Sequence, residues 1–470
     1  MDTKKLRQKI LDLAIHGKLV PQDPNDEPAS VLLERIRAEK EQLIKEGKIK
    51  APKKSKSAGD TSHYPKDVPF AVPEGWVWCH LSDLASFAGG KTPSMDNKDF
   101  WKNGKHLWIT SKDMKSRYLI DSQMKISDTA VREMTVFHPG TILMVNRSGI
   151  LRRTLPLAIL NAEATINQDI KAIVPYLLCI SPYLYYAILS QESFILSEYK
   201  KAGTTVDNIN FDKFISLLIP LPPQKEQDRI VSSINQYFAI IENIDSSQKE
   251  LNTSLEAAKA KILDLAIRGK LEPQDPNEEP AIELLKRINP NFKASDNLHY
   301  EGVIPDGWQI CRLSDLFKVT MGQSPDGTSL NRSTGIEFHQ GKICFTEKYL
   351  SESDIFTTSA TKCAEPNSLL CCVRAPVGVF NITSRRICIG RGLCSLSPLD
   401  ADVDIEYWFY ALSSLTEYYE SMATGSTFKA ISGDIIRNTV IAVPPRMEQK
   451  RIFDQITRLF SVLKEFSDTI

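Results

Sequence analysis

Residues 9–36 of the chain read KILDLAIHGKLVPQDPNDEPASVLLERI, and residues 261–288 read KILDLAIRGKLEPQDPNEEPAIELLKRI. The two segments are identical at 22 of 28 positions, at an offset of 252 residues. Self-similarity at this level indicates that one structural unit is built twice. The repeat therefore decides how the rest of the sequence is divided.

Two further pairs of segments indicate that the repeat is circularly permuted. PEGW at 73–76 matches PDGW at 305–308, and PPQKEQDRI at 222–230 matches PPRMEQKRI at 444–452. With the last offset of 222, residue 470 corresponds to position 470 − 222 = 248, and residue 1 corresponds to position 1 + 252 = 253. The C-terminal and N-terminal pieces together imitate the uninterrupted central piece. This pattern predicts a pseudo-twofold arrangement with neighbouring termini.

The central piece is expected to be one long helix. No Gly and no further Pro occur between Pro223 and Arg268, and a glycine follows. A helix of about 46 residues would be roughly 70 Å long. Its apolar residues form a heptad seam broken at Gln248, so we predict an antiparallel partner made of the helix after Pro445 and the helix up to His16. The seam residues are Ile234, Tyr237, Ile241, Ile244, Leu251, Leu255, Ala258, Ile262 and Leu265.

Each repeated segment leaves its helix through an extended stretch, GKLxPQDPNxEPA, which starts at Gly17 and again at Gly269. The prolines favour an extended backbone, and Asn25 or Asp26 can cap a short helix that starts near Pro28. Such a stretch, used twice, suggests a docking surface for another protein, and a turn that packs on its own domain is an equal alternative. The candidate partner-docking residues are Gln22, Asp23, Glu226, Gln227, Gln274, Asp275, Glu448 and Gln449.

The composition favours a soluble, cytoplasmic protein. Lys plus Arg and Asp plus Glu both total 58 in 470 residues, so any DNA contact must use local basic patches or partner chains. The nine Cys include no CxxC pair and predict neither a disulfide framework nor a metal site. The charged N-terminus does not resemble a signal peptide, and no apolar run approaches the roughly 20 residues that span a bilayer.

The repeated segments divide the chain into two variable domains and the conserved pieces around them. Each variable domain has strand-like apolar runs, such as 141–145 and 368–373, and a later amphipathic helix, near 182–196 and 405–419. We predict the α+β class, with two mixed α/β domains separated by long antiparallel coiled-coil helices. The predicted pieces are an N-terminal helical segment at 1–36, a basic linker at 37–71, a first variable domain at 72–221, a central helix and docking segment at 222–288, a linker at 289–303, a second variable domain at 304–443 and a C-terminal helix at 444–470. The lysines of the first linker favour a solvated, flexible segment over a phosphate-binding one.

Polar and basic residues gather in loops at corresponding places in both variable domains. GGKTP at 89–93 matches MGQSP at 321–325, and GTTV at 203–206 matches GSTF at 425–428. An Arg follows a strand-like run in each domain, where a guanidinium could read a guanine edge. Short polar side chains beside Gly can bond phosphates or bases, so the set of loops predicts DNA contact, whereas a surface turn explains any one of them. The candidate DNA-binding residues are Lys91, Thr92, Lys112, Asn146, Arg147, Gln168, Thr204, Thr205, Gln323, Ser324, Arg374, Arg391, Ser426 and Thr427.

Over nearly its whole length the chain resembles the type I restriction–modification specificity (S) subunit family. The resemblance rests on the paired PxGW starts, WITSKD at 108–113, the Gly-Ser/Thr-Thr loops and the two PPxxEQxxI helix starts. It implies a non-catalytic subunit that reads a bipartite, asymmetric target in double-stranded DNA, with the helices setting the spacer between the half-sites. It also implies two modification (methyltransferase) subunits and added restriction subunits as partners. These partners, and not this chain, would bind S-adenosylmethionine, ATP and Mg²⁺.

Rival interpretations of the sequence are weaker. NPNF at 289–292 resembles the Asn-Pro-Pro-aromatic motif of adenine methyltransferases, but it lacks the second Pro and no Gly-rich cofactor loop precedes it. No P-loop occurs, so neither a catalytic residue nor a nucleotide site is predicted. A scaffold that binds only proteins would explain the long helices and the zero net charge, but it would not need the paired polar loops. The second domain is expected to differ in its contacts, because Cys344–Thr346 takes the place of Trp108–Ile109.

Overall fold

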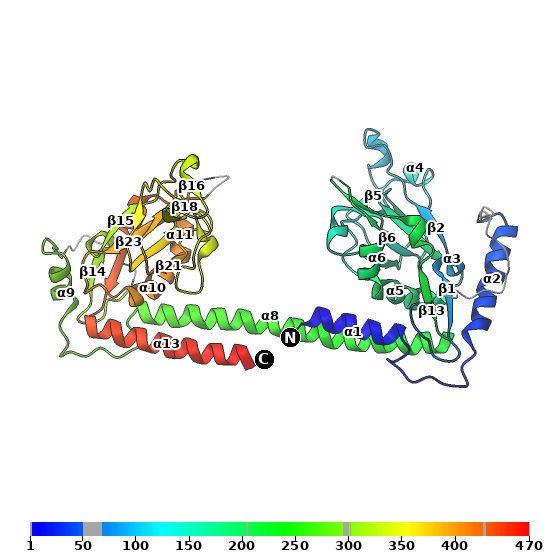
Figure 1. Cartoon of the computed structure of the whole chain (residues 1–470), viewed down its shortest axis with the longest axis horizontal. Coiled ribbons are helices and arrows are strands. Elements are labelled where there is room, and N and C mark those ends of the chain that lie inside the picture. Colours follow the sequence, from blue (N-terminus) through cyan, green and yellow to red (C-terminus); the bar gives the residue numbers. More distant parts are fainter. Residues whose placement is uncertain are drawn as a thin grey trace. The chain divides into compact units, whose positions relative to one another are not determined.

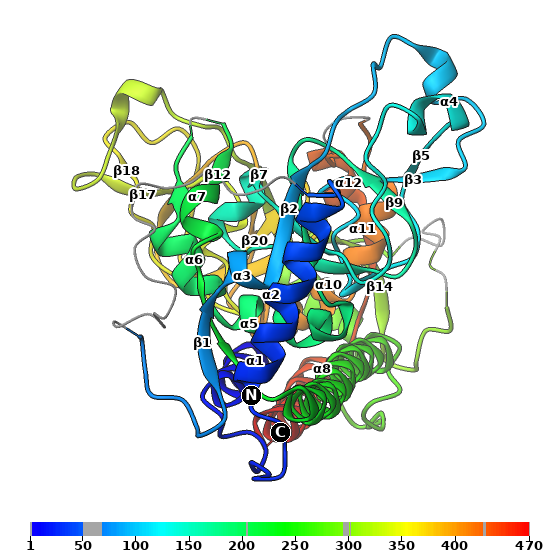
Figure 2. The ribbon, with the colours of Figure 1, turned by 90° about the vertical axis from the view of Figure 1, so that its right-hand side faces the viewer.

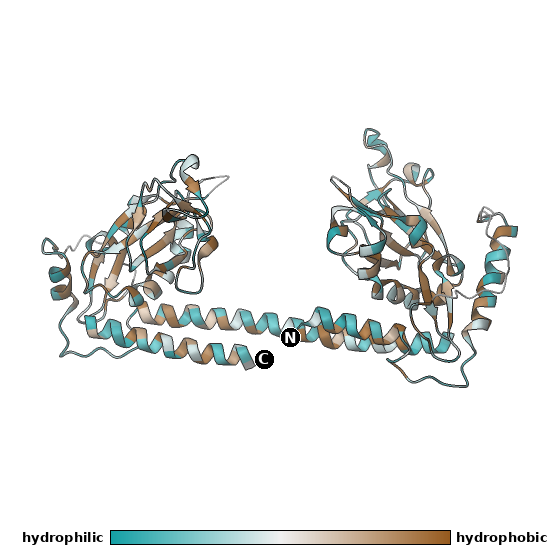
Figure 3. Cartoon of the chain, in the orientation of Figure 1, coloured by the Kyte–Doolittle hydropathy of each residue, from teal (hydrophilic) through white to brown (hydrophobic). Residues whose placement is uncertain are grey.

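The computed structural model describes residues 2–49, 68–203, 205–294, 300, 302–425 and 429–469. The chain forms two compact units, 1–247 and 248–470, and the long helix α8 (Gln224–Ile267) belongs partly to each (Figure 1). Each unit contains several small β-sheets with helices beside them, which confirms the predicted α+β class. The strands are mostly apolar, whereas apolar and polar residues alternate along the long helices (Figure 3).

In the first unit the main sheet has five strands in the order β2-β10-β6-β8-β4. Strands β6 and β8 are fully buried and pair antiparallel, with Ile142 opposite Ile159. Smaller sheets, β1-β13, β5-β3-β9 and β11-β12-β7, complete the domain. The strands are β1 Val77–His80, β2 Ala85–Gly89, β3 His106–Ile109, β4 Tyr118–Leu119, β5 Met124–Ile126, β6 Ile142–Val145, β7 Arg147–Ser148, β8 Leu157–Leu160, β9 Ala164–Ile166, β10 Ile170–Pro175, β11 Lys200–Lys201, β12 Asp207–Ile209 and β13 Leu218–Leu221; short helices are α3 Leu81–Leu84, α4 Asp128–Val131 and α7 Phe211–Phe214.

The second unit has a four-stranded sheet, β15-β23-β20-β21, and a five-stranded sheet, β16-β18-β17-β22-β19. Strand β20 is buried along its whole length and lies between β21 and β23. A two-stranded sheet, β14-β24, closes the domain next to its helices. The elements are β14 Gln309–Arg312, β15 Phe317–Met321, β16 Leu330–Asn331, β17 Ile336–His339, β18 Phe356–Thr357, β19 Cys363–Ala364, β20 Ser368–Cys372, β21 Phe380–Thr383, β22 Ile387–Ile389, β23 Leu393–Pro398, β24 Val440–Val443 and the short helix α12 Gly433–Asn438.

The amphipathic helix predicted late in each variable domain is broken into two. The first domain has α5 (Ser181–Ser190) and α6 (Glu192–Glu198), and the second has α10 (Ile405–Ser413) and α11 (Thr416–Met422). At the first break, Gln191 Nε2 donates to Leu218 O at 3.1 Å, which ties the turn to β13. The break allows the second helix of each pair to bury its own apolar side chain, since Ile195 and Tyr419 are both fully buried.

The predicted long helices are present with nearly the expected bounds. These are α1 (Thr3–Ile15), α8, and α13 (Arg446–Thr469). At about 1.5 Å per residue, the 44 residues of α8 span roughly 66 Å. Both α1 and α8 end before a glycine with a positive φ, +65° at Gly17 and +61° at Gly269, which is the backbone geometry of a helix C-terminal cap. No helix in the described part of the chain is both long and apolar enough to cross a bilayer.

Within the first unit, α1 runs antiparallel to the first part of α8 (Figure 1) and packs against α5 (Figure 2). Arg7 of α1 donates to Asp245 of α8 at 3.0 Å. The seam residues Ile234 and Ile241 are buried as predicted, whereas Tyr237 is 45% exposed, so the prediction of a buried side chain there was wrong. Within the second unit, α13 packs with the end of α8 in one apolar cluster. The pseudo-twofold arrangement and the neighbouring termini stay predictions.

The short helix predicted to start near Pro28 is present in both copies, directly after Pro28 and Pro280, but the first copy is longer than predicted. The first copy, α2 (Ala29–Lys45), is 17 residues long and occupies the start of the predicted basic linker at 37–71. The second copy, α9 (Ala281–Ile288), has 8 residues. Asp26 does not cap α2, because its carboxylate accepts a hydrogen bond from Arg229 of α8 at 2.6 Å. The extended segment is therefore held by the long helix and not by a local cap.

The strand pairing corrects the alignment of the two variable domains. In the first domain β3 pairs parallel with β9, and Trp108 lies opposite Thr165. In the second domain β17 pairs parallel with β22, and Phe338 lies opposite Cys388. Phe338–His339 is thus the counterpart of Trp108–Ile109, and Cys344–Thr346 is not. The sequence alignment failed here because the two strands share backbone pairing but no residue types.

Candidate nucleic-acid interface

The loop after β2 meets the loop between β9 and β10 at one end of the first variable domain. The Lys91 N–H donates to Ile166 O at 3.0 Å, and Thr92 Oγ1 donates to Gln168 Oε1. A Cβ at Gly90 would lie 2.2 Å from two carbonyl oxygens of the second loop, so only glycine permits this approach. The Lys91 side chain is 64% exposed. Three predicted DNA-contact residues, Lys91, Thr92 and Gln168, thus share one surface.

A third loop joins this surface at β7. The N–H groups of Asn146 and Arg147 donate to Asp169 O at 2.8 and 3.1 Å. Strand β7 pairs with β12, where Asn208 lies opposite Arg147, and Thr205 comes two residues before β12. Arg147 and Thr205 are exposed, whereas Asn146 is half-buried. The bonds to Asp169, next to Gln168, place Asn146 and Arg147 at the same end of the domain as Lys91, and we call Lys91, Thr92, Asn146, Arg147 and Gln168 the first loop surface.

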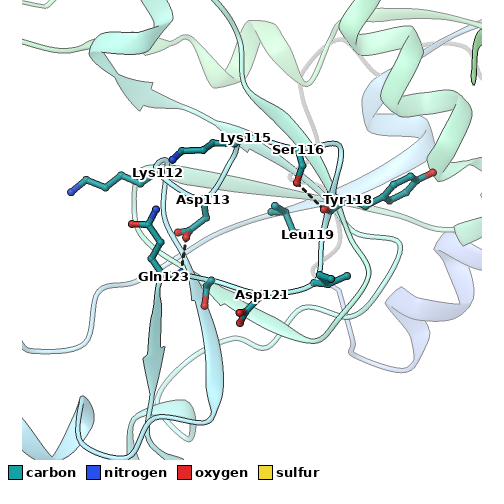
Figure 4. Close-up of a pocket in the computed structure, with 10 residues that line it drawn as sticks. Lys112, Asp113, Lys115, Ser116, Tyr118, Leu119, Asp121 and Gln123 are labelled. Carbon is teal, nitrogen blue, oxygen red and sulfur yellow. Dashed lines mark hydrogen bonds between the residues drawn. The ribbon is translucent and has the colours of Figure 1, made fainter. Parts of the chain in front are cut away.

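Lys112 lies at the rim of an open hollow of about 400 Å³ (Figure 4). Asp113 fixes the turn, because its Oδ2 accepts hydrogen bonds from the N–H and the hydroxyl of Thr110, each at 2.8 Å. Asp113 Oδ1 accepts the Gln123 N–H at 2.8 Å, which ties the turn to the residue before β5. Lys115 also lines the hollow and was not selected from the sequence. Because Asp113 and Asp121 line it together with the two lysines, the hollow is a second polar feature of the first variable domain.

The second unit repeats the loop surface with other side chains. The Gln323 N–H donates to Ile389 O at 2.9 Å, and the Arg391 N–H donates to Ser324 Oγ at 3.4 Å. A Cβ at Gly322 would lie 2.2 Å from the carbonyl oxygen of Gly390, which is the close approach made by Gly90 in the first unit. Arg391 is exposed. Gln323, Ser324 and Arg391 thus form the second loop surface.

Arg374 belongs to the same end of the second domain. It follows β20 and lines a hollow of about 200 Å³ together with Gln340 and Lys342. The residue before it, Val373, donates its N–H to Gly392 O at 3.0 Å, beside Arg391. Gln340 and Lys342 were missed because the alignment of this region was shifted. The predicted DNA-contact residues that lie outside the described residues are Thr204, Ser426 and Thr427.

A charged network that the sequence did not reveal supports β17. Glu337 accepts hydrogen bonds from Arg385 Nε and Nη2, both at 2.6 Å, and lies 2.8 Å from His339 Nε2. Burial alone would raise the pKa of Glu337, but Arg385, the Ser353 N–H and His339 lower it to about 2. Burial lowers the pKa of His339, so its ring is neutral at neutral pH. Because Arg385 also donates to Leu350 O at 3.1 Å, the network holds β17 to the loop that follows it.

A buried carboxylate fastens the extended segment of the first unit. Glu226, at the start of α8, accepts hydrogen bonds from Gln22 Nε2 at 3.0 Å and from Trp76 Nε1 at 2.9 Å. One turn later, Arg229 forms an ion pair with Asp26 at 2.6 Å. The segment, the variable domain and the long helix therefore meet at one carboxylate, which we call the first carboxylate junction.

The second unit contains the same junction. Glu448, at the start of α13, accepts hydrogen bonds from Gln274 Nε2 at 3.1 Å and from Trp308 Nε1 at 2.9 Å. Burial raises the pKa of Glu448, and the bonds from Gln274 and Trp308 offset part of that effect. Arg451 forms an ion pair with Glu278, as Arg229 does with Asp26. The sequence repeat thus preserves a complete hydrogen-bond arrangement.

Six of the eight predicted partner-docking residues fall into two groups, and the other two, Gln22 and Gln274, are exposed residues whose Nε2 groups donate to Glu226 and Glu448. Glu226, Gln227, Glu448 and Gln449 are at most 1% exposed, and both carboxylates and the Nε2 groups of both glutamines form hydrogen bonds within the chain. Asp23 and Asp275 are exposed, and each accepts a backbone N–H two residues ahead at 2.9 Å. Only the second group presents a charge to the surroundings. Docking of a partner at these residues stays a prediction.

The family of the type I restriction modification DNA specificity domain matches residues 73–253 and 305–469. The specificity subunit of the type I restriction enzyme EcoAI of Escherichia coli is 28% identical over 383 residues, which are 68% of this chain and 63% of that protein. This chain thus covers somewhat less than two thirds of the EcoAI subunit. The EcoEI specificity subunit of E. coli is 25% identical over an alignment that covers 99% of this chain and 90% of that protein.

Among solved structures, the chain is similar in fold to one from a study of complex assembly and conformational transition of the type I R-M system. The TM-score is 0.59 and the sequence identity is 24%, and the match covers 85% of this chain and 95% of the other. At that identity the likeness bears on the fold. The two matched segments each begin at a PxGW start and extend into the helix that follows the variable domain.

Proposed function

The chain belongs to the type I restriction modification DNA specificity domain family, and we propose that each of its units reads one half of a bipartite, asymmetric DNA target. The reading parts are the two variable domains, which we place at 72–221 and 304–443. Sequence-specific reading needs positioned donors and acceptors, whereas it needs no catalytic group. The chain is accordingly the non-catalytic subunit that selects the DNA sequence.

The observation that carries this proposal is the repeated loop surface. In both units, loops from distant parts of the sequence meet at one end of the variable domain through the same backbone contacts, such as those at Gly90 and Gly322. The side chains on that frame differ between the units. A shared frame with different polar groups is what two readers of unlike half-sites require. The differing groups are Lys91, Thr92, Arg147 and Gln168 in the first unit and Gln323, Ser324, Arg374 and Arg391 in the second.

The subunit acts within a restriction–modification complex, and we propose two methyltransferase subunits and added restriction subunits as its partners. The exposed sides of the two extended segments, with Asp23 and Asp275, are the proposed docking surfaces. Their inner sides are fastened by the carboxylate junctions, so the exposed sides are held in a defined shape. S-adenosylmethionine, ATP and Mg²⁺ would be bound by the partners, because this chain is assigned recognition alone.

A genome-wide map of adenine methylation tests the proposal. The map is measured in a strain with an active methyltransferase partner, with the gene present, deleted and restored. Deletion is expected to remove one split motif with a fixed gap, and restoration is expected to return it. An unchanged map after deletion would contradict the reading function and favour a scaffold that binds only proteins.

A further inference from the structure

In the first unit, the guanidinium of Arg117 lies among three tyrosine rings between the variable domain and α8. The Arg117 Cζ lies 4.4 Å from the ring centroid of Tyr186, 4.7 Å from that of Tyr118 and 5.4 Å from that of Tyr185. Arg117 Nη1 donates to the Tyr186 hydroxyl at 2.6 Å and to Asn235 Oδ1 on α8. Arg117 thus bonds at once to the domain helix α5 and to the long helix.

The second unit holds a lysine in the same kind of cage. Lys348 Nζ lies 4.7 Å from the ring centroid of Phe453 on α13 and 5.0 Å from that of Tyr410 on α10. The rings of Tyr349 and Phe409 lie at 5.6 and 5.9 Å. Again one cation from the variable domain contacts both the domain helix and a long helix.

Backbone bonds show that the two cations occupy equivalent positions. The Ile159 N–H donates to Arg117 O at 2.7 Å in the first unit, and the Ile382 N–H donates to Lys348 O at 2.8 Å in the second. The ring pair beside each cation is equivalent too. Tyr186 meets Phe238 edge to face at 5.8 Å and 88°, and Tyr410 meets Phe460 edge to face at 5.5 Å and 88°. The arrangement is therefore built twice, and we call each copy an aromatic clamp.

Each clamp residue follows a loop that lines one of the two hollows. Arg117 directly follows the turn at 112–116 that lines the hollow of the first domain. Lys348 follows the segment at 340–342 that lines the hollow of the second. The clamp therefore connects a polar loop of the variable domain to the helix that carries the domain. A tilt of the domain on this helix would change the distances between the cation and the rings.

From this placement we propose that Arg117 and Lys348 are positioning residues that hold each DNA-reading domain at a set angle on its helix and thereby restrict the spacer between the half-sites. The inference rests on the proposed reading function. Cation–ring attraction is strongest when the cation is shielded from water, and Arg117 Nε and Nη2 are buried with no hydrogen-bond partner among the described residues. The ring contacts and the bonds from Nη1 to Tyr186 and Asn235 are therefore the interactions that hold this guanidinium in place.

The two clamps differ in whether an acidic residue pairs with the cation, and this difference allows a control experiment with Arg and Lys exchanged. Lys348 forms an ion pair with Glu406, whereas the described part of the chain provides no ion pair for Arg117. Lysine cannot reproduce the planar guanidinium that stacks on Tyr186 and bonds Asn235 at the same time. We therefore expect R117K to restore only part of the function lost in R117M, and K348R to keep most of the wild-type function.

The test uses the full chain expressed with its methyltransferase partner in a strain that lacks the native gene, with the adenine-methylation map as readout. For R117M and K348M we expect both half-site sequences to persist, while methylation at the native spacer falls about tenfold. New methylation is expected at sites whose spacer is one base pair longer or shorter. K102M, which alters an exposed cation of the same domain, is expected to leave the map unchanged.

The spacer lengths at methylated sites distinguish a misplaced domain from a loss of folded protein. A smaller amount of folded protein lowers methylation at every site, but it adds no sites with a new spacer length. An R117M map with the wild-type spacer and wild-type extent would overturn the inference, as would a uniform loss without new spacers. If R117M yields no folded chain, Y186F keeps the ring and removes the bonded hydroxyl. It should give the same spacer change to a smaller extent, and an unchanged Y186F map would then overturn the inference. A wild-type chain that specifies no motif would instead contradict the proposed function itself.

Discussion

At the scale of single residues, buried carboxylates hold this chain together in two different ways. Glu226 and Glu448 each accept two side-chain hydrogen bonds from partners more than a hundred residues away in sequence. Glu337, which is partly buried, accepts two hydrogen bonds at 2.6 Å from one guanidinium and a third from the Ser353 N–H at 2.7 Å. A buried carboxylate is stable only with such donors, and a donor left behind by its removal loses a hydrogen bond that water cannot replace. The effects of removing these carboxylates can therefore be predicted.

Replacing Glu226 by alanine should destabilise the first unit. Trp76 is 6% exposed, so its Nε1–H would be left buried without an acceptor, at a cost of roughly 1–3 kcal/mol. The thermal unfolding midpoint of the purified chain should fall in E226A. The matched control is E74A, which removes an exposed carboxylate two residues before Trp76 and should leave the midpoint in place. Equal midpoints for E226A and the wild type would refute a stabilising role for the junction.

The pKa of Glu337 predicts a loss of stability in acid. The ordinary value of 4.5 falls to about 2 in the folded chain, so the contribution is complete above pH 4.5 and disappears as the pH falls toward 2. His339 acts in the same direction, because a buried neutral imidazole also resists protonation.

Unfolding midpoints measured from pH 6 to pH 3 check this prediction. E337Q should be less stable than the wild type at pH 6, and the difference should shrink as the pH falls. The control E347Q changes an exposed carboxyl in the same unit and should follow the wild-type curve. A constant difference between E337Q and wild type across the pH range would show that the titration of Glu337 contributes nothing.

At the scale of elements, α8 is the one helix shared by both units, and it is continuous for 44 residues. A helix has a fixed rise per residue, so each inserted or deleted residue changes its length by a known amount. Helices α1 and α13 pack against it in the first and second unit, respectively. The residues between those contacts, such as Ser246 and Ser247, are exposed, so that an insertion there need not disturb a core.

Inserting four residues after Ser247 should lengthen the DNA spacer that the chain accepts. Four residues add about 6 Å of helix and slightly more than one turn, which nearly preserves the helix faces. With about 3.4 Å per base pair, the preferred spacer should grow by about two base pairs. The methylation map of the insertion variant measures this directly. S246A/S247A keeps the length and should keep the spacer, and an insertion variant with the original spacer would refute the ruler hypothesis.

At the scale of the whole molecule, the chain is two units with separate cores. One apolar cluster is confined to residues between Ile10 and Ile241, and another to residues between Ala266 and Ile456. Each loop surface is built entirely within one unit. A change on one surface should therefore leave the other unaltered, because sites without shared partners behave independently.

Independence of the units predicts that recognition changes one half-site at a time. R147Q should relax or alter the motif at one half-site only, and R391Q should do so only at the other. An arginine that reads a base contributes about 1–3 kcal/mol of discrimination, so the altered half-site should accept additional bases. The motif recovered from methylation maps of both variants decides the matter. Simultaneous change of both halves in R147Q would contradict independent reading.

The sequence alone determined the architecture of repeats and helices. The bounds of α8 and α13 followed from Pro223, Pro445 and Gly269, because glycine and proline act on the backbone locally and need no tertiary partner. The pairing of the loops at 89–93 and 321–325 followed from residue identity. The buried strands β6 and β20 were visible as apolar runs.

The tertiary structure decided everything that depends on contacts between distant residues. It placed Phe338–His339 opposite Trp108–Ile109, broke the late helix of each domain, and turned Glu226 and Glu448 inward. The aromatic clamps at Arg117 and Lys348 are the clearest case, since an arginine in one copy and a lysine in the other share no sequence signal. The physical reason is that a helix or turn propensity depends on residues that are close in sequence. A cage of rings, in contrast, forms only after two helices and a sheet have packed together.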